Sequence, residues 1–406
     1  MAGQFQPVAV KFTRDSYIFV EGKPNADRFY IIREGKVRIF READLEKPEG
    51  NIAGAGEMFG VVSAMASHGY IESAIAMTDV TLLAVEKKQY GDLIRKSPPV
   101  AINTVRQFSQ RMRHLDETLS RRALKSAASN SPSHLFQIGE FYESVGKSSQ
   151  ALYSYQQYLA YCPNAENTDQ VKKRIAKMES RATVVRPTYS PDTMVQTYPK
   201  DCLLFAEGES GHNLYIIQKG SVKITKIVNN QEVVLAVLNK GDIFGEMAML
   251  EDKPRAATAE IYEDTTLLAV NRANFTNLIN DQPDMVVRMT TLMSERIWLL
   301  YRQLANTLIE NPVGRIYDAL LIQLEKDRLD LSSNMPYLCN FGFKELAGMA
   351  GISEMESNGL YKRISAAKKI SLNNNKVFVS NVADVFKEAE YYRRAQEMGK
   401  EIQDKS

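Results

Sequence analysis

A glutamate and an arginine stand close together in one glycine-containing stretch, residues 244–259, and could jointly hold a sugar phosphate. The guanidinium of Arg255 offers a permanent positive charge and a planar set of donors to a phosphate group. The carboxylate of Glu246 can accept a hydrogen bond from a sugar hydroxyl. Gly245 lets the backbone approach closely, and the Met247–Ala248 pair could open a short helix whose N-terminus favours an anion. The alternative is a surface ion pair beside a turn.

The pattern F-G-E-x-A followed by P-R-A-A-T resembles the phosphate-binding cassette of cyclic-nucleotide-binding domains. The resemblance implies a site made by Gly245, Glu246, Met247, Ala248, Arg255 and Ala256. It implies cAMP as the ligand and cGMP less so, because Ala256 stands where a threonine is associated with cGMP. It also implies that the helix after the barrel covers the base through Arg296, Leu300 and Tyr301. These helical residues could instead belong to the core.

The chain carries an internal repeat. Tyr30 corresponds to Tyr215 and Val85 to Val270, an offset of 185 residues in both cases. Short strand-like runs separated by glycine turns predict an antiparallel jelly-roll barrel in each copy. A helix with apolar residues three and four positions apart follows each barrel. Each helix could pack on its own barrel or form a coiled-coil seam with another helix.

The first copy lacks the charged pair of the second. With the same offset, Glu246 corresponds to Val61 and Arg255 to Tyr70. A phosphate without a counter-charge would be costly in a poorly solvated site. We therefore expect the first copy to bind no cyclic nucleotide in the usual mode and to have a structural or pairing role, with a different ligand as the alternative.

Residues 132–165 resemble one tetratricopeptide repeat. The positions that carry the resemblance are Leu135, Ile138, Gly139, Tyr142, Ala151, Tyr155, Tyr158 and Pro163. A further helix is expected over 168–180, and 181–191 are expected to be a linker. Because a single repeat cannot bury its faces alone, it must dock on a barrel, on a second copy or on a protein partner. The alternative is a helical spacer.

The C-terminal part resembles the DNA-binding domain of the Crp/Fnr regulator family. The resemblance begins at Asn311-Pro-Val-Gly-Arg-Ile316 and continues with a helix, a glycine turn and a second helix over 343–368. The segment 370–379 is expected to form a hairpin, which completes a winged helix-turn-helix. The implied DNA-contacting residues are Ser353, Glu354, Glu356, Asn358, Lys362 and Arg363. From residue 311 onward 14 Lys or Arg face 13 Asp or Glu, so a winged domain that binds protein instead is the alternative.

Composition restricts the class of protein. The 406 residues have a formal net charge of +2 and 44% hydrophobic residues, which is ordinary for a globular protein. No apolar run is long enough for a membrane span, and three scattered cysteines favour a reducing cytoplasm. Four scattered histidines show no metal spacing. The segment 208–211 resembles a nucleophile elbow but lacks its last glycine, so we expect no enzyme.

The sequence thus predicts an α+β multidomain chain with two jelly-roll barrels, a helical insert and a winged helix-turn-helix. The predicted segments are 1–124 (degenerate barrel), 125–182 (helical repeat and linker), 183–310 (intact barrel) and 311–406 (winged domain). We predict a cytoplasmic, cAMP-responsive transcription regulator of the Crp/Fnr type that binds double-stranded DNA as a homodimer. The alternative is a cAMP-sensing adaptor that acts on a protein partner without DNA.

Overall fold

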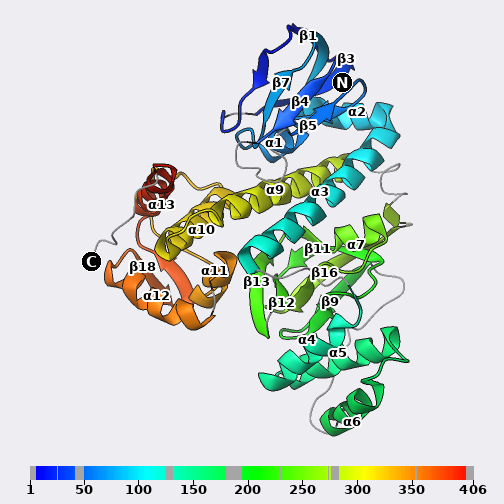
Figure 1. Ribbon diagram of the computed structural model, residues 1–406, viewed down its shortest axis with the longest axis vertical. Helices are drawn as coiled ribbons and strands as arrows, with labels where there is room; N and C mark the ends of the chain where they lie inside the picture. The colour runs from blue at the N-terminus through cyan, green and yellow to red at the C-terminus, as the bar shows by residue number, and fades with distance from the viewer. Residues whose placement is uncertain are drawn as a thin grey trace. The chain divides into compact units, whose positions relative to one another are not determined.

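The computed structural model describes residues 6–24, 26–41, 50–124, 131–179, 194–228, 230–272, 274–275, 283–352 and 354–398 (Figure 1). The chain forms two compact units. The first contains Met1–Met112 and Ala273–Tyr301, and the second contains Arg113–Arg272 and Arg302–Ser406. The linker expected over 181–191 lies outside the described residues.

The first unit contains the first barrel. Its described strands are β1 (Val8–Phe12), β2 (Tyr17–Phe19), β3 (Arg28–Glu34), β4 (Val37–Phe40), β5 (Asn51–Ala53), β6 (Met58–Phe59), β7 (Ser73–Ala76) and β8 (Val80–Glu86). They form two antiparallel sheets with the orders β1-β8-β3-β6 and β2-β7-β4-β5. Alternating residues such as Phe19, Tyr30 and Leu82 fill the core between the sheets.

The second unit contains the second barrel. Its described strands are β9 (Val195–Tyr198), β10 (Leu203–Phe205), β11 (Asn213–Lys219), β12 (Ser221–Val228), β13 (Gln231–Asn239), β14 (Ile243–Phe244), β15 (Thr258–Ile261) and β16 (Thr265–Asn271). The sheet orders are β14-β11-β16-β9 and β10-β15-β12-β13. Strand for strand this is the order of the first barrel, which confirms that the sequence repeat is a repeat of one domain.

Helices connect and flank the barrels. They are α1 (Val61–Ala66), the 3-10 helix Lys87–Gln89, α2 (Tyr90–Lys96), α3 (Pro98–Leu124), α7 (Glu246–Glu251) and α9 (Pro283–Asn306). The apolar stripe of α3 is buried at Val105, Phe108, Met112, Leu115 and Leu119. The first unit holds the start of α9 against α2, where Thr290 and Tyr90 share a hydrogen bond. The part of α9 up to Tyr301 therefore belongs to the unit of the first barrel.

The helical insert consists of α4 (His134–Ser144), α5 (Ser148–Tyr161) and α6 (Thr168–Glu179). A Cβ on Gly139 would lie 2.5 Å from the ring of Tyr155, so this glycine permits α4 and α5 to approach closely. The core of the insert is continuous with Leu203, Ala206 and Ile227 of the second barrel. Among the predicted alternatives for this segment, the structure therefore shows docking on a barrel (Figure 1).

The C-terminal module consists of α10 (Pro312–Lys326), α11 (Phe343–Met349), α12 (Glu354–Ala366), α13 (Val382–Glu397) and a sheet β17-β19-β18. The strands are β17 (Tyr337–Leu338), β18 (Ile370–Asn373) and β19 (Lys376–Val379). Asn311 caps α10 by accepting from the backbone N–H groups of Val313 and Gly314. The module shares its core with Val234 and Val237 of β13. None of the described helices is long and apolar enough to cross a membrane.

Candidate ligand-binding site

A tight turn between β14 and α7 places the glutamate of the candidate site. Gly245 has φ 77°, in the left-handed region that favours glycine. A Cβ at this position would lie 2.6 Å from Nη1 of Arg255 and 3.2 Å from the carbonyl oxygen of Asn213. Glu246 begins α7 directly after the turn and is only 1% exposed. Gly245 is therefore required both for the backbone angle and for the approach of the arginine.

Arg255 is held at several points. Its backbone N–H donates to the carbonyl oxygen of Glu209 over 2.7 Å, and its own carbonyl accepts from Gly208 over 3.0 Å. Its Nη1 donates to the carbonyl oxygen of Gly245 over 2.7 Å. The guanidinium carbon lies 4.1 Å from the ring centre of Phe205. These contacts fix the direction of a side chain that is only 4% exposed.

Burial of the charged guanidinium of Arg255 is energetically unfavourable. Burial lowers its pKa, whereas the charges of Tyr215, Glu209 and Glu246 act in the opposite direction. Within the described part of the chain its Nε has no hydrogen-bond partner. A buried N–H of a cation without an acceptor is strongly unfavourable. The arrangement therefore fits an anionic group that would bring both an acceptor and a negative charge.

The structure brings the residues of the predicted cassette together. Met247 and Ala248 are buried on α7, and Ala256 is buried next to Arg255. A Cβ on Gly211 would lie 2.4 Å from Nε of Arg255 and 2.6 Å from Cβ of Ala248. Because these small residues surround the guanidinium, the backbone can come close to it from two sides.

Three residues predicted to cover the base belong to the other compact unit. Arg296, Leu300 and Tyr301 are on the part of α9 that belongs to the first unit, whereas Glu246 and Arg255 belong to the second. In the first unit, the hydroxyl of Tyr301 accepts from Nε of Arg111 over 2.9 Å.

The first barrel has a different arrangement at the corresponding positions. The ring of Tyr70 stacks on Phe19 with centroids 4.0 Å apart, in the way the guanidinium of Arg255 lies over Phe205. Its hydroxyl donates to the carbonyl oxygen of Arg28 over 3.3 Å. Val61, which corresponds to Glu246, is buried. Neither charge of the second site is present here.

Sequence reasoning missed the loop that supports Arg255. One carboxylate oxygen of Glu209 accepts from the backbone N–H of Ala206 over 2.8 Å, and the other accepts from the hydroxyl of Tyr153 over 3.2 Å. Burial raises the pKa of Glu209 to about 7. A comparison of the two copies contains the signal, since Lys23 follows Gly22 where Glu209 follows Gly208.

The residues predicted to contact DNA lie on α12. The side chains of Glu356, Asn358, Lys362 and Arg363 are exposed. Glu354 is the first residue of the helix, and Ser353 lies outside the described residues. Among the described residues there is also no cluster of His, Cys, Asp and Glu that could hold a metal ion.

Two matching antiparallel barrels, one with a buried arginine beside a glutamate at a glycine turn, define a cyclic nucleotide-binding module. Residues 9–97 and 195–282 each match the family described as the cyclic nucleotide-binding domain. Both barrels therefore belong to this domain class.

The chain belongs to the family of the cyclic AMP receptor protein. It is 31% identical over 157 residues to the "Cyclic AMP receptor protein" of Thermus thermophilus, which is 38% of this chain and 69% of that protein. It is 24% identical over 185 residues, 45% of this chain and 83% of the relative, to a "CRP-like cAMP-activated global transcriptional regulator" of Mycobacterium tuberculosis. A solved structure of a CooA mutant from Carboxydothermus hydrogenoformans is 19% identical with a TM-score of 0.41, and the match covers 48% of this chain and 87% of that one.

Proposed function

We propose that the chain is a transcription regulator that responds to cAMP bound in its second barrel. The observation that carries this proposal is Arg255, a buried guanidinium fixed at its backbone and at Nη1, with an Nε that has no hydrogen-bond partner among the described residues. The cyclic phosphate would pair with this guanidinium. The ribose hydroxyl would donate to Glu246 in the turn that Gly245 makes possible.

The choice of cAMP over cGMP depends on Ala256. Its methyl group has no donor or acceptor for a guanine, whereas a threonine at this position would have both. The cAMP-activated regulator of Mycobacterium tuberculosis supports the same choice, because its name states its ligand. We therefore assign cAMP as the preferred ligand.

The first barrel has a structural role in this proposal. Tyr70 occupies the position above Phe19 with an uncharged ring, and Val61 offers no acceptor to a ribose. A cyclic phosphate placed there would lose its hydration without gaining a counter-charge.

We propose that the C-terminal module is the DNA-binding part of the regulator. We assign α11 and α12 to a helix-turn-helix and β18 and β19 to its wing, with α12 as the helix that enters the major groove. Ser353, Glu354, Glu356 and Asn358 would face base edges, and Lys362 and Arg363 would meet phosphates. A homodimer would read a two-fold symmetric site. Asn311, which caps α10, marks the boundary at which the module would reorient.

A protein-directed adaptor is the second candidate. The observation in its favour is the charge of the module, with 14 Lys or Arg against 13 Asp or Glu from residue 311 onward. Duplex DNA repels carboxylates, and two of them stand at the start of α12. In this case the module or the helical insert would bind a protein partner.

Calorimetry on the full chain tests the ligand assignment. We expect one site for cAMP, weaker binding of cGMP, and a loss of about tenfold or more in cAMP affinity for Arg255→Ala, since a hydrogen bond to a charged group contributes ~1.5–3 kcal/mol. Arg272→Ala is the matched control, because Arg272 is an exposed arginine of the same barrel with an ion pair to Asp252. Equal affinities for both variants would refute the site.

A DNA titration separates the two candidate functions. Binding to duplex DNA through phosphates weakens steeply as the salt concentration rises. A regulator should show this dependence together with a gain in affinity on addition of cAMP. An adaptor should show no binding to any duplex in a random-sequence selection.

A further inference from the structure

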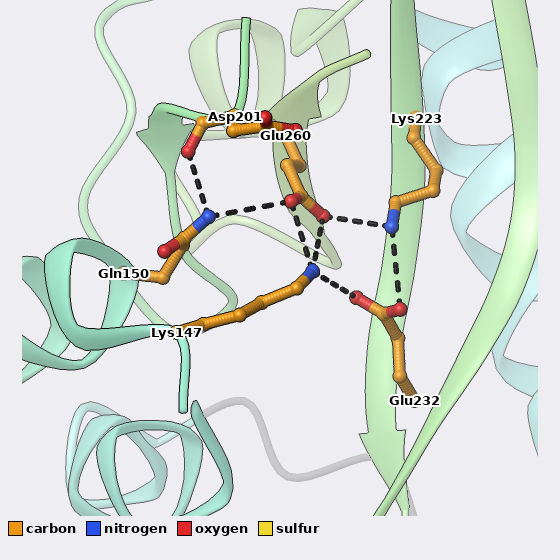
Figure 2. A network of polar contacts seen from close by, with 6 residues as sticks. All are labelled: Lys147, Gln150, Asp201, Lys223, Glu232 and Glu260. Carbon is orange, nitrogen blue, oxygen red and sulfur yellow. Dashed lines mark hydrogen bonds and ion pairs between the residues drawn. The ribbon is translucent and has the colours of Figure 1, made fainter. Parts of the chain in front are cut away.

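The helical insert is joined to the second barrel by a network of charged side chains around the buried Glu260 (Figure 2). Nζ of Lys147, just before α5, lies 3.0 Å from a carboxylate oxygen of Glu260 on β15. Nζ of Lys223 on β12 lies 2.8 Å from the other oxygen of Glu260 and 3.2 Å from Glu232 on β13. Gln150 on α5 donates to the backbone carbonyl of Asp201 over 2.7 Å.

This network fixes the position in which the insert packs on the barrel. Glu260 is 3% exposed, and its attraction to the ammonium groups of Lys223 and Lys147 lowers its pKa against the opposing effect of burial. Removing one partner of such a pair leaves a buried charge without compensation, which is strongly unfavourable. With the shared apolar core around Leu203 and Ala206, the insert and this side of the barrel form one packed body.

The insert also contacts the loop between β10 and β11. The hydroxyl of Tyr153 on α5 donates to a carboxylate oxygen of Glu209 over 3.2 Å and lies 3.4 Å from the backbone oxygen of Leu204. Nε2 of His134 on α4 lies 3.6 Å from the carboxylate of Glu207. A Cβ on Gly208 would lie 2.9 Å from the backbone oxygen of Ser131. The insert thus contacts three consecutive residues, 207–209.

Two of these residues, Gly208 and Glu209, hold the arginine of the candidate site. The carbonyl oxygen of Glu209 accepts from the backbone N–H of Arg255, and the N–H of Gly208 donates to the carbonyl of Arg255. The carboxylate of Glu209 also attracts the buried guanidinium. Glu209 is therefore bound to Tyr153 by its side chain and to Arg255 by its backbone.

We infer that the helical insert is part of the nucleotide site, with Tyr153 as a positioning residue that holds Glu209 and thereby Arg255 in the binding geometry. The inference rests on the proposed function, because it assumes that Arg255 binds the cyclic phosphate. Tyr153 touches no ligand in this arrangement. Its contribution is preorganisation, since a loop already fixed loses less freedom when the ligand binds.

A comparison of two tyrosines on the same helix tests the inference in the full chain, with cAMP as the titrant in calorimetry. Tyr153→Phe removes the hydroxyl that meets Glu209. Tyr155→Phe is the control, because its hydroxyl donates to Glu143 over 2.8 Å inside the insert. We expect cAMP affinity to fall about three- to tenfold for Tyr153→Phe, the effect of one lost hydrogen bond, and to stay within about twofold for Tyr155→Phe.

A double-mutant cycle shows whether the effect passes through Glu209. In a Glu209→Ala background, Tyr153→Phe should weaken cAMP binding no further, because the acceptor of its hydroxyl is already gone. A purely structural role of Tyr153 would give the same loss in both backgrounds. That result, or an unchanged affinity of Tyr153→Phe, would overturn the inference while leaving the ligand assignment intact. If the wild type and Tyr155→Phe both ignored cAMP at millimolar concentration, the proposed function and the inference would fail together.

Discussion

Arg111 on α3 donates a hydrogen bond from its Nε to the hydroxyl of Tyr301 on α9 over 2.9 Å. The same guanidinium forms an ion pair with Glu72, two residues after Tyr70. The guanidinium carbon of Arg41 lies 4.0 Å from the centre of the Tyr301 ring. Within the first unit Arg111 therefore links Tyr301 to Glu72, in the segment that corresponds to the candidate phosphate-binding stretch of the second barrel.

We predict that Arg111→Ala destabilises the first unit by about 3 kcal/mol, because Glu72 is 5% exposed and would lose its cation. Tyr301→Phe should cost less, about 1.5 kcal/mol, the lower end of the range for a hydrogen bond with a charged partner, because Arg111 keeps its ion pair with Glu72. Trp298, the single tryptophan of the chain, stacks on His68 in this unit and reports its unfolding by fluorescence. Arg106→Ala is the control, since Arg106 is exposed on the same helix. A similar loss in both arginine variants would contradict the prediction.

A second prediction concerns the number of ligand sites. Calorimetry should give one cAMP site per chain, and Tyr70→Ala should change neither the stoichiometry nor the affinity. The reason is that Tyr70 fills a position where the second barrel has a guanidinium, so its removal leaves the charged site untouched. Two sites in the wild type would show that the first barrel also binds cAMP. One site that survives Arg255→Ala but not Tyr70→Ala would place the ligand in the first barrel instead of the second.

Much of the fold was predictable because the turns and strands of the repeat depend on residues that are close in sequence. Glycine turns and alternating apolar residues recur at one offset, and both barrels adopt the same strand order. The residues of the charged site were predictable for the same reason, since Gly245, Glu246 and Arg255 are close in sequence. The local turn and helix place residues that are this close in sequence relative to one another.

The partners of Tyr301 and Glu209 were not predictable in this way. Tyr301 meets Arg111, and Glu209 meets Tyr153, across long separations in the sequence. An apolar stripe on a helix indicates that one face is buried, but not which surface buries it. The sequence also did not show which surface the insert packs against, because a single helical repeat needs a partner surface without specifying one.

A third prediction follows from the acid–base chemistry of Glu209. Burial raises its pKa from 4.5 to about 7, although Ala206, Tyr153 and Arg255 act in the opposite direction. Between these pH values the folded chain binds more protons at this site than the unfolded chain, so the free energy of unfolding falls as the pH rises. The fall due to this group is at most about 3 kcal/mol.

Denaturant unfolding of the second unit at about pH 5 and about pH 7.5 measures this effect against the Glu209→Gln variant. The wild type should lose more stability between the two pH values than the variant does. His134 titrates with the opposite sign, because burial lowers its pKa, but it is present in both proteins and cancels in the comparison. Identical pH dependence in the two proteins would show that Glu209 is ionised throughout this range.

The last prediction concerns the exposed face of α12. If this helix enters the major groove, Lys362 and Arg363 lie where backbone phosphates pass, and each lost contact removes about 0.9 from the slope of log affinity against log salt. Changing both residues to alanine should reduce that slope by about 2 and weaken specific and non-specific duplexes to a similar extent. Arg394→Ala is the control, because Arg394 is an exposed arginine on α13 of the same module, with a side chain that is 74% exposed. Equal slopes for the double variant and the control would remove α12 from the DNA interface, and with the acidic start of this helix that result would favour a protein partner.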